Sequence, residues 1–475
     1  MAILPELMLL TGAAAFFVIS LYKQLDFNQV KNAVVCFGVV TFIAALISLK
    51  SQATMFYGSY EVDLYSQVFK LMISFGVAIV LIFGKNLKDI EESDRPEYYI
   101  FLFLSALGLM MVVSSVELIS IFVSLELSSF ALYLLVPMRS DKNGLRVQME
   151  AGIKYILFGV LATGFMLFGM SYIFGLTGTT YLQEIMVGLQ TAPQPAALFA
   201  IIMVLAGFFF KLAVFPMHFW VPDIYQGASN ETTGFIATVP KLAAVALLIR
   251  ITSMSSGNIQ FLVYLLMFLA VCSMFYGNLS ALVQTDLKRM LGFSGIAHAG
   301  FILLGLLTMD AGGYAIAIYY ISGYVVMNLA CFLVLCNVSQ NGENLEIKDL
   351  QGLHKRQPVL AFILAVSLFA LAGIPPFVGF MGKFMLLTGA LKAGPESLIY
   401  LIVVILAAIN TGIAIYYYLS VVRTAYTTDP EDRPDVTVDG FTQTVGIGLV
   451  LLIIIMGALP AKLVALADTA VRTIM

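Results

Sequence analysis

The sequence predicts an all-α polytopic membrane protein with about fourteen transmembrane helices. Of its 475 residues, 60% are hydrophobic and only 11% are charged, whereas about a quarter of the residues of a soluble chain are charged. Apolar runs close to the length of a spanning helix recur from one terminus to the other. The 38 glycines agree with this class, because glycine is commoner in membrane helices than in soluble ones.

Each expected span is an apolar run of about 20 residues, the length that crosses the hydrocarbon core as a helix. The first run has no Lys or Arg before it, which favours a retained helix over a cleaved signal peptide. The connections are too short for a second domain, so residues 1–475 are expected to form one membrane domain. In chain order, the expected spans are 3–22, 31–49, 64–84, 98–116, 118–138, 150–174, 197–219, 232–252, 259–283, 289–308, 312–338, 357–391, 397–424 and 440–463.

The orientation of the chain follows from the positive charges in alternate connections. The connections after odd-numbered spans are rich in Lys and Arg, whereas those after even-numbered spans hold little beyond Lys50, Arg250 and Lys392. The positive-inside rule therefore places the odd connections in the cytoplasm and both termini outside. The positive residues of the odd connections are Lys23, Lys31, Lys85, Lys88, Arg95, Arg139, Lys142, Arg146, Lys288, Arg289, Lys348, Lys355, Arg356, Arg423 and Arg433.

Two spans carry prolines that interrupt a continuous helix. Pro216 and Pro222 lie at the end of the seventh span, and Pro375 and Pro376 lie inside the twelfth. Proline removes a backbone donor and clashes with the preceding turn, so both helices are expected to be broken. Carbonyls freed at membrane depth persist only where protein or a water-filled cavity satisfies them.

Broken helices at corresponding places in two halves are typical of transporters built from inverted repeats. The spans allow two inverted five-helix repeats, 98–252 and 259–424, in which helices 7 and 12 are the matching broken ones. Residues 1–97 then hold helices 1–3, and residues 440–463 form helix 14.

Six ionisable residues inside the expected spans are the candidate site residues. A charged side chain near the centre of a membrane helix costs about 2.5–3.5 kcal/mol on insertion scales, so such residues usually mark a path for ions or protons. The six residues are Glu126, Lys154, Lys211, Lys241, His298 and Lys383.

The position of each residue suggests a role. Glu126 has no charged neighbour one turn away, so its partner must come from another helix, either as a structural ion pair or as a carboxylate that tunes a lysine. Lys241 lies near the middle of its span, and Lys211 and Lys383 lie beside the two breaks. A buried lysine influenced by a nearby carboxylate can load and release a proton.

The remaining candidates have two interpretations each. Lys154 lies nearer the cytoplasmic end of its span, where it serves the path or extends to the interface. His298 suits a proton relay because histidine titrates near neutral pH, but it equally suits a structural bond to a hydroxyl. His218, in the seventh helix, is expected to be a structural hydrogen-bonding residue, and His354 a solvated loop residue. Lys70 and Glu117, near span ends, need no special role.

No cofactor is expected in this chain. Its four cysteines lie in apolar runs and form no CxxC pair, which argues against an iron–sulfur cluster. The stretch Gly379-Phe-Met-Gly382-Lys383 lacks the spacing of a phosphate-binding loop. A net charge of −3 without a basic tract argues against nucleic acid as a partner. The lipid bilayer is the one partner that composition alone requires.

Three motifs lie around the lysines of the expected spans. They are Pro222-Asp-Ile-Tyr-Gln-Gly-Ala228, preceded by Lys211, then Val239-Pro-Lys241-Leu-Ala, and Gly373-Ile-Pro-Pro-Phe-Val-Gly-Phe-Met-Gly-Lys383. Together they resemble the antiporter-like subunits of respiratory complex I, and the resemblance covers nearly the whole chain. The family implies two inverted repeats and broken helices 7 and 12.

The resemblance also implies a role for each matching residue. Glu126 matches the helix-5 glutamate, which is thought to pair with the helix-7 lysine, Lys211. Lys241 matches the central lysine of helix 8, Lys383 the helix-12 lysine near the exit to the outside, and Lys154 a lysine of helix 6. The implied activity is proton translocation from the cytoplasm to the outside, coupled to quinone reduction elsewhere in the complex.

The implied setting is a bacterial inner membrane. The implied partners are other complex I subunits, especially neighbouring antiporter-like and small membrane-arm subunits, and the flavin, iron–sulfur clusters and quinone are expected in partner subunits. The alternatives are a subunit of a multi-chain sodium/proton antiporter and the membrane subunit of a hydrogenase or other dehydrogenase.

The chain departs from the family pattern at two places. After Ala228 the family commonly continues with prolines and threonines, whereas this chain reads Ser229-Asn-Glu231-Thr-Thr. Helix 10 of the family often carries serines before its histidine, where this chain has Gly295 and Ala297. The second departure predicts a drier approach to His298.

Overall fold

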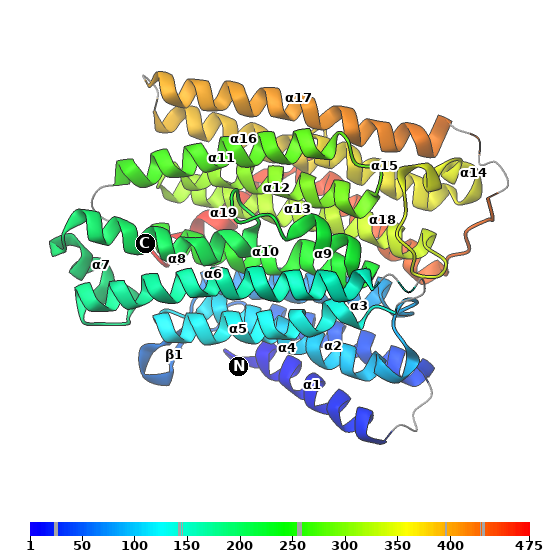
Figure 1. Cartoon of the computed structure of the whole chain (residues 1–475), viewed down its shortest axis with the longest axis horizontal. Coiled ribbons are helices and arrows are strands. Elements are labelled where there is room, and N and C mark those ends of the chain that lie inside the picture. The colour runs from blue at the N-terminus through cyan, green and yellow to red at the C-terminus, as the bar shows by residue number, and fades with distance from the viewer. Residues whose placement is uncertain are drawn as a thin grey trace.

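The computed structural model is a bundle of roughly parallel and antiparallel helices (Figure 1). It describes residues 1–22, 27–140, 144, 146–253, 259–394, 397–427, 429 and 433–475. Lys23 and Lys142, two of the positive residues used for the orientation, lie outside these ranges. Within the described part, thirteen helices are long and apolar enough to cross a membrane, which confirms the predicted all-α class.

The thirteen long helices follow the expected spans closely. They are α1 Leu4–Tyr22, α2 Phe27–Ser48, α3 Leu64–Phe83, α4 Arg95–Ser114, α5 Leu118–Leu135, α6 Val147–Thr177, α8 Gln194–Leu212, α10 Asn230–Ser253, α11 Ile259–Ala281, α12 Leu287–Leu306, α13 Ala311–Val338, α17 Leu398–Thr427 and α18 Gly440–Ala458. The twelfth expected span is divided into α15 Pro358–Ala372 and α16 Val378–Ala393.

Several short elements were not predicted. A two-stranded antiparallel hairpin, β1 Ala53–Met55 with β2 Tyr60–Val62, joins α2 to α3. The helices α7 Leu182–Thr191, α9 Val221–Gly227, α14 Leu353–Arg356 and α19 Pro460–Val471 lie between or after the spans. The expected last span is shorter than predicted because α18 ends at Ala458 and the chain restarts at Pro460 as α19, which packs against α13 and α3.

The two predicted breaks have the same local geometry. In α8 the left-handed residue is Ala213, with φ +66°, and in α15 it is Gly373, with φ +90°. The next amide donates to a carbonyl five residues back in each case, from Val214 to Phe209 at 2.9 Å and from Ile374 to Phe369 at 3.0 Å. This bonding satisfies carbonyls that the end of a helix would leave unpaired.

The most buried helices form the centre of the bundle. In α10 and α12 94% of the spanning window is buried, and in α13 89%, whereas α17 buries only 28% and α6 33%. Figure 1 shows α17 along one edge and α1 along the other, with α12 and α13 between them. The residues at the α10, α12 and α13 contacts are therefore the ones most shielded from lipid and water.

Candidate functional site

Lys241 lies at the contact of the three central helices and is 1% exposed. From α10 its ammonium donates to the Tyr324 hydroxyl of α13 at 3.0 Å and to the Gly295 carbonyl of α12 at 3.2 Å. A Cβ atom on Gly295 would lie 2.7 Å from the ammonium nitrogen and 2.9 Å from the Tyr324 oxygen. Glycine at this position therefore allows the lysine to reach α12.

His298 lies beside this lysine and is bonded at both ring nitrogens. Its Nδ1 is 2.7 Å from the Tyr320 hydroxyl, and its Nε2 is 3.2 Å from the Tyr418 hydroxyl of α17. The His298 and Tyr324 rings have centroids 5.1 Å apart. Because a hydroxyl can donate or accept, both the neutral and the protonated imidazole can be satisfied here.

Lys383 lies at the break of the twelfth helix. From α16 its ammonium donates to the carbonyls of Leu371 and Ala372, at 3.0 and 3.1 Å, in the last turn of α15. These carbonyls lack partners within their own helix. The lysine is buried and packs against the Phe301 ring of α12, 5.1 Å from its centroid. Lys241, His298 and Lys383 therefore form one buried polar row across α10, α12, α13, α16 and α17.

Glu126 of α5 and Lys211 of α8 do not touch each other. Lys211 is buried in the last turn of α8, and its ammonium has no hydrogen-bond partner in the described chain. Glu126 instead accepts a hydrogen bond from Thr163 at 2.8 Å. The two charges still interact through space, but the direct ion pair that the family resemblance implies is absent within 4 Å in the described residues.

Lys154 belongs to a surface ion-pair network rather than to the buried row. Its ammonium is 2.7 Å from Glu150 and 2.7 Å from Asp223 of α9, and its side chain is 36% exposed. Asp223 also binds Arg289 of α12 at 3.0 Å. The network joins α6, α9 and α12 at one end of the bundle, in agreement with the interfacial interpretation of this lysine.

Three residues differ from their expected positions. Lys288, expected in a connection, is 0% exposed and donates to the Ala228 carbonyl at 2.7 Å. Lys70 is also fully buried and lies 2.6 Å from Glu6, so it is part of a buried ion pair. His218 makes no hydrogen bond in the described chain and is packed between aromatic rings, the nearest being Tyr276 at 4.2 Å. Lys288 therefore belongs to the first turn of α12 and not to a connection, and the expectation that His218 makes a structural hydrogen bond is wrong for the described chain.

His354 is likewise not simply solvated. Its Nδ1 lies 3.0 Å from the Ala425 carbonyl, and its ring stacks on Tyr426 with centroids 5.6 Å apart. These contacts hold α14 against the end of α17, so the residue has a structural role.

The tyrosines of the buried row were missed by the sequence analysis. Tyr320, Tyr324 and Asn328 are spaced four residues apart, so they share one face of α13. The first two contact His298 and Lys241, and the Asn328 Oδ1 atom is buried without a partner in the described chain. A hydroxyl or amide at every fourth position of an apolar helix is the signal that could have found them.

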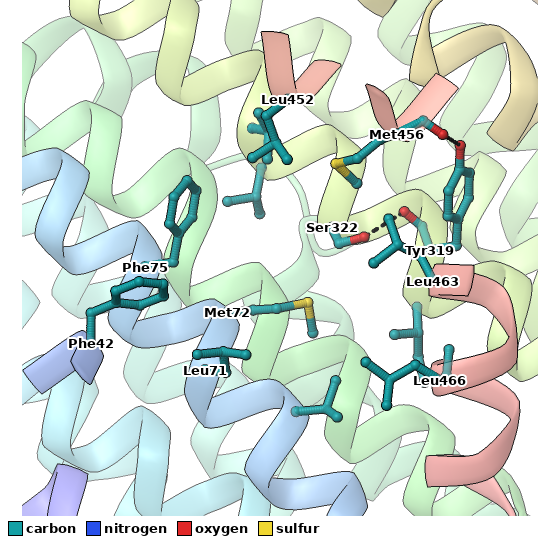
Figure 2. Close-up of a pocket in the computed structure, with 15 residues that line it drawn as sticks. Phe42, Leu71, Met72, Phe75, Tyr319, Ser322, Leu452, Met456, Leu463 and Leu466 are labelled. Carbon is teal, nitrogen blue, oxygen red and sulfur yellow. Dashed lines mark hydrogen bonds between the residues drawn. The ribbon is translucent and has the colours of Figure 1, made fainter. Parts of the chain in front are cut away.

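An apolar pocket lies on another side of α13. Its volume is about 230 Å³, and Figure 2 shows Phe42, Met72, Phe75 and Leu452 on its wall. The Tyr319 hydroxyl donates to the Met456 carbonyl at 2.7 Å, and the Ser322 hydroxyl to the Tyr319 carbonyl at 2.7 Å. Because both hydroxyls are already engaged, the pocket has little capacity to orient a polar ligand.

The described residues contain no group of three or more His, Cys, Asp or Glu side chains arranged to hold a metal ion. Cys36, Cys272, Cys331 and Cys336 are all free. The ionisable groups that the buried row brings together are lysine, histidine and tyrosine side chains, which can exchange protons.

Comparison with known proteins defines the class. Residues 115–410 match the model of the family described as NADH:quinone oxidoreductase/Mrp antiporter, transmembrane. The chain belongs to this family of antiporter-like membrane subunits. A chain of respiratory complex I from Thermus thermophilus with bound aureothin has 29% identity and a TM-score of 0.83, covering 98% of this chain and 99% of that one.

Two relatives with high identity share the name of one kind of subunit within the family. NADH-quinone oxidoreductase subunit N 2 of Opitutus terrae is 48% identical over 99% of this chain and 98% of its own length. The protein of the same name from Syntrophobacter fumaroxidans is 40% identical over 100% and 99%. The Mrp complex of Dietzia sp. shares the fold, with a TM-score of 0.86 at 20% identity. Within the family, the chain therefore groups with subunit N.

Proposed function

We propose that this chain is a proton-translocating membrane-arm subunit of a complex I-type NADH:quinone oxidoreductase. The main support for the proposal is the buried row from Lys241 through His298 to Lys383. Burying three ionisable groups at membrane depth is energetically costly, and such groups usually mark a path for ions or protons. The similarity to subunit N relatives supports the same assignment. Flavin, iron–sulfur clusters and quinone would lie in partner subunits.

The contacts suggest how a proton passes along the row. The Lys241 ammonium is held by a hydroxyl and a carbonyl, and no carboxylate of the described chain lies within 4 Å of it. It can therefore release a proton without breaking an ion pair. Tyr324 and His298 supply groups that both donate and accept, and Lys383 receives the proton for release to the outside. Changes in the separation of Glu126 and Lys211 would alter the electrostatic field along this path.

The inverted-repeat organisation is part of the proposal. Residues 98–252 would form the first repeat and residues 259–424 the second. The matching left-handed endings of α8 and α15, each beside a buried lysine, support that pairing. Glu126 and Lys211 would then serve the first repeat, while His298 and Lys383 serve the second.

The proposed location is the bacterial inner membrane with both termini on the outer side. The excess of Lys and Arg in the odd connections supports this orientation. The proposed partners are the neighbouring antiporter-like and small membrane-arm subunits of the same complex. Lipid would cover the poorly buried helices α6 and α17.

A Lys241→Ala variant tests the proposal. It should assemble normally but lower both NADH-driven proton pumping and quinone reduction in membrane vesicles, because the buried row loses its central proton carrier. Retention of both activities would contradict the mechanism.

A subunit of a sodium/proton antiporter is the second candidate, favoured by the fold shared with the Mrp complex. A native gel of mildly solubilised membranes, stained for NADH dehydrogenase activity, separates the two candidates. Detection of the chain by mass spectrometry in the large active band supports the complex I assignment. Its presence only in a smaller inactive band would favour the antiporter.

A further inference from the structure

Glu231 is a buried carboxylate for which the steps above have no role. It is the second residue of α10, ten positions before Lys241, and it is 4% exposed. Its Oε2 atom is buried without a hydrogen-bond partner in the described chain. Burying an ionised carboxylate without full pairing is costly, so a residue of this kind requires an explanation.

The charged neighbours of Glu231 do not pair with it directly. The Lys88 ammonium donates to the carbonyls of Ser339 and Cys336, at 2.7 and 3.1 Å, and Lys288 donates to the Ala228 carbonyl at 2.7 Å. Asp89 forms an ion pair with Arg139. The titratable and charged groups that face Glu231 from the surrounding elements are Lys88, Asp89, Tyr98, Tyr99, Lys288 and Cys336.

These contacts argue against a purely structural ion pair. Both lysines are close enough to stabilise a negative charge on Glu231, yet their N–H groups bond main-chain carbonyls. The carboxylate therefore has charges around it but no side chain paired with it, and the hydrogen bond that it does accept comes from its own backbone N–H. Binding a proton would remove the cost of its unpaired oxygen, and releasing that proton would restore the attraction to the two lysines.

Polar groups occupy the space between Glu231 and Lys241. Ten helical residues span about 15 Å, which is too far for direct transfer. The Tyr225 hydroxyl, on α9, is buried without a partner and its ring lies 3.2 Å from the Cβ position of Gly292, one turn before Gly295 on α12. From α13, Asn328 adds a second unpartnered oxygen one turn from Tyr324. Both groups belong to segments that contact α10 close to Glu231: the Tyr225 carbonyl accepts a hydrogen bond from Thr233 at 3.1 Å, and Phe332, one turn after Asn328, lies 3.2 Å from the Cβ position of Gly234.

We propose that Glu231 is a proton-binding residue that takes a proton from the side of the Lys- and Arg-rich connections and supplies it to Lys241. The carboxylate gains a proton from the aqueous phase and then loses it to the neutral amine of Lys241, with Tyr225 and Asn328 between them. No electron transfer is involved. This inference rests on the proposed proton-translocating function and adds an entry residue to it.

The test is a Glu231→Gln variant in the whole complex, assayed in inside-out membrane vesicles. Glutamine keeps the shape of the side chain beside Gly84 but cannot carry the proton. NADH-driven acidification of the vesicle interior is measured over a range of external pH. We expect the pumping rate to fall about tenfold at alkaline pH, equivalent to about 1.4 kcal/mol of added barrier, and to fall less at acidic pH, where protons are abundant.

Two further variants and one spectroscopic measurement make the result specific. Glu231→Asp retains a carboxyl group and should restore most of the rate. Glu92→Gln removes an exposed carboxylate at the same end of the bundle, with a side chain that is 83% exposed, and should leave the pH profile unchanged. Infrared difference spectra should lose one protonated-carboxyl band in Glu231→Gln. If Glu231→Gln does not assemble, the pH profile of Glu231→Asp takes its place and should shift relative to that of the unmodified complex.

A pH profile of the Glu231→Gln complex identical to that of the unmodified complex would overturn the inference, as would an unshifted Glu231→Asp profile where only that variant assembles. Lys241→Ala, measured in the same vesicles, separates this failure from failure of the proposed function. If Lys241→Ala stops pumping while Glu231→Gln pumps normally, Glu231 is not on the proton path, but the proposed function stands. If Lys241→Ala pumps normally, the proposed path through Lys241 is itself wrong.

Discussion

Replacing Gly295 with alanine should impair proton pumping without unfolding the protein. The new Cβ atom would lie 2.7 Å from the Lys241 ammonium and 2.9 Å from the Tyr324 hydroxyl, well inside contact distance. The nearer atom is the end of a flexible side chain, so the lysine can move aside and the fold survives. Its bonds to the Gly295 carbonyl at 3.2 Å and to Tyr324 at 3.0 Å would lengthen or break.

The size of the effect follows from these bonds. A hydrogen bond to a charged group contributes about 1.5–3 kcal/mol, and each 1.4 kcal/mol or so changes a rate about tenfold. Loss of the contact between Lys241 and Tyr324 should therefore slow proton transfer by about tenfold or more. The assay is NADH-driven acidification of inside-out vesicles, measured together with NADH:quinone reductase activity and with assembly on a native gel.

The structure provides a matched control for this substitution. Gly164 lies on α6 and has nothing within 4 Å of its Cβ position, so Gly164→Ala adds the same methyl group to open space. It should pump normally. If Gly295→Ala also pumps at the unmodified rate, the reasoning that links the Lys241 position to proton transfer is refuted.

Three other substitutions have expected outcomes. Tyr320→Phe removes the hydroxyl 2.7 Å from His298 and should slow pumping about fivefold, the effect of one neutral hydrogen bond of about 1 kcal/mol, while normal pumping would argue against a relay through the histidine. Asp63→Asn breaks a buried ion pair with Arg250 at 2.9 Å and should destabilise the fold by about 3–5 kcal/mol, seen as a lower melting temperature of the isolated complex. Lys383→Met leaves two α15 carbonyls without their donor and should abolish pumping while the native-gel band persists; continued pumping would place the exit elsewhere.

The spans and both breaks could be predicted because their signals are local. A run of about 20 apolar residues is sufficient to predict a spanning helix, and the prolines near Lys211 and Lys383 are sufficient to predict an interruption. The ends of the breaks, at Ala213 and Gly373, lie within the expected spans. The lysines at membrane depth could be predicted from the sequence in the same way.

The partners of those lysines could not be predicted, because they lie far away in the sequence. Lys241 contacts Gly295 and Tyr324, 54 and 83 positions later, and which face of α13 meets α10 depends on packing across the whole bundle. Lys288 was misplaced for a different reason. A lysine at the edge of an apolar run is expected to lie in a connection. Lys288 is buried only because residues 221–229 fold over α12.

The two hydrogen bonds from Lys383 to the end of α15 have a mechanical consequence. The charged ammonium is attracted to the negative, C-terminal end of the α15 dipole, and it donates hydrogen bonds to two of the last carbonyls of that helix. When the proton leaves, the neutral amine keeps weaker donors and loses that attraction to the dipole. The joint between α15 and α16 is therefore stiffer with the proton bound than without it. Loss of the proton from Lys383 therefore loosens the joint between α15 and α16. The arrival and departure of a single proton can in this way be transmitted as movement along the two helices.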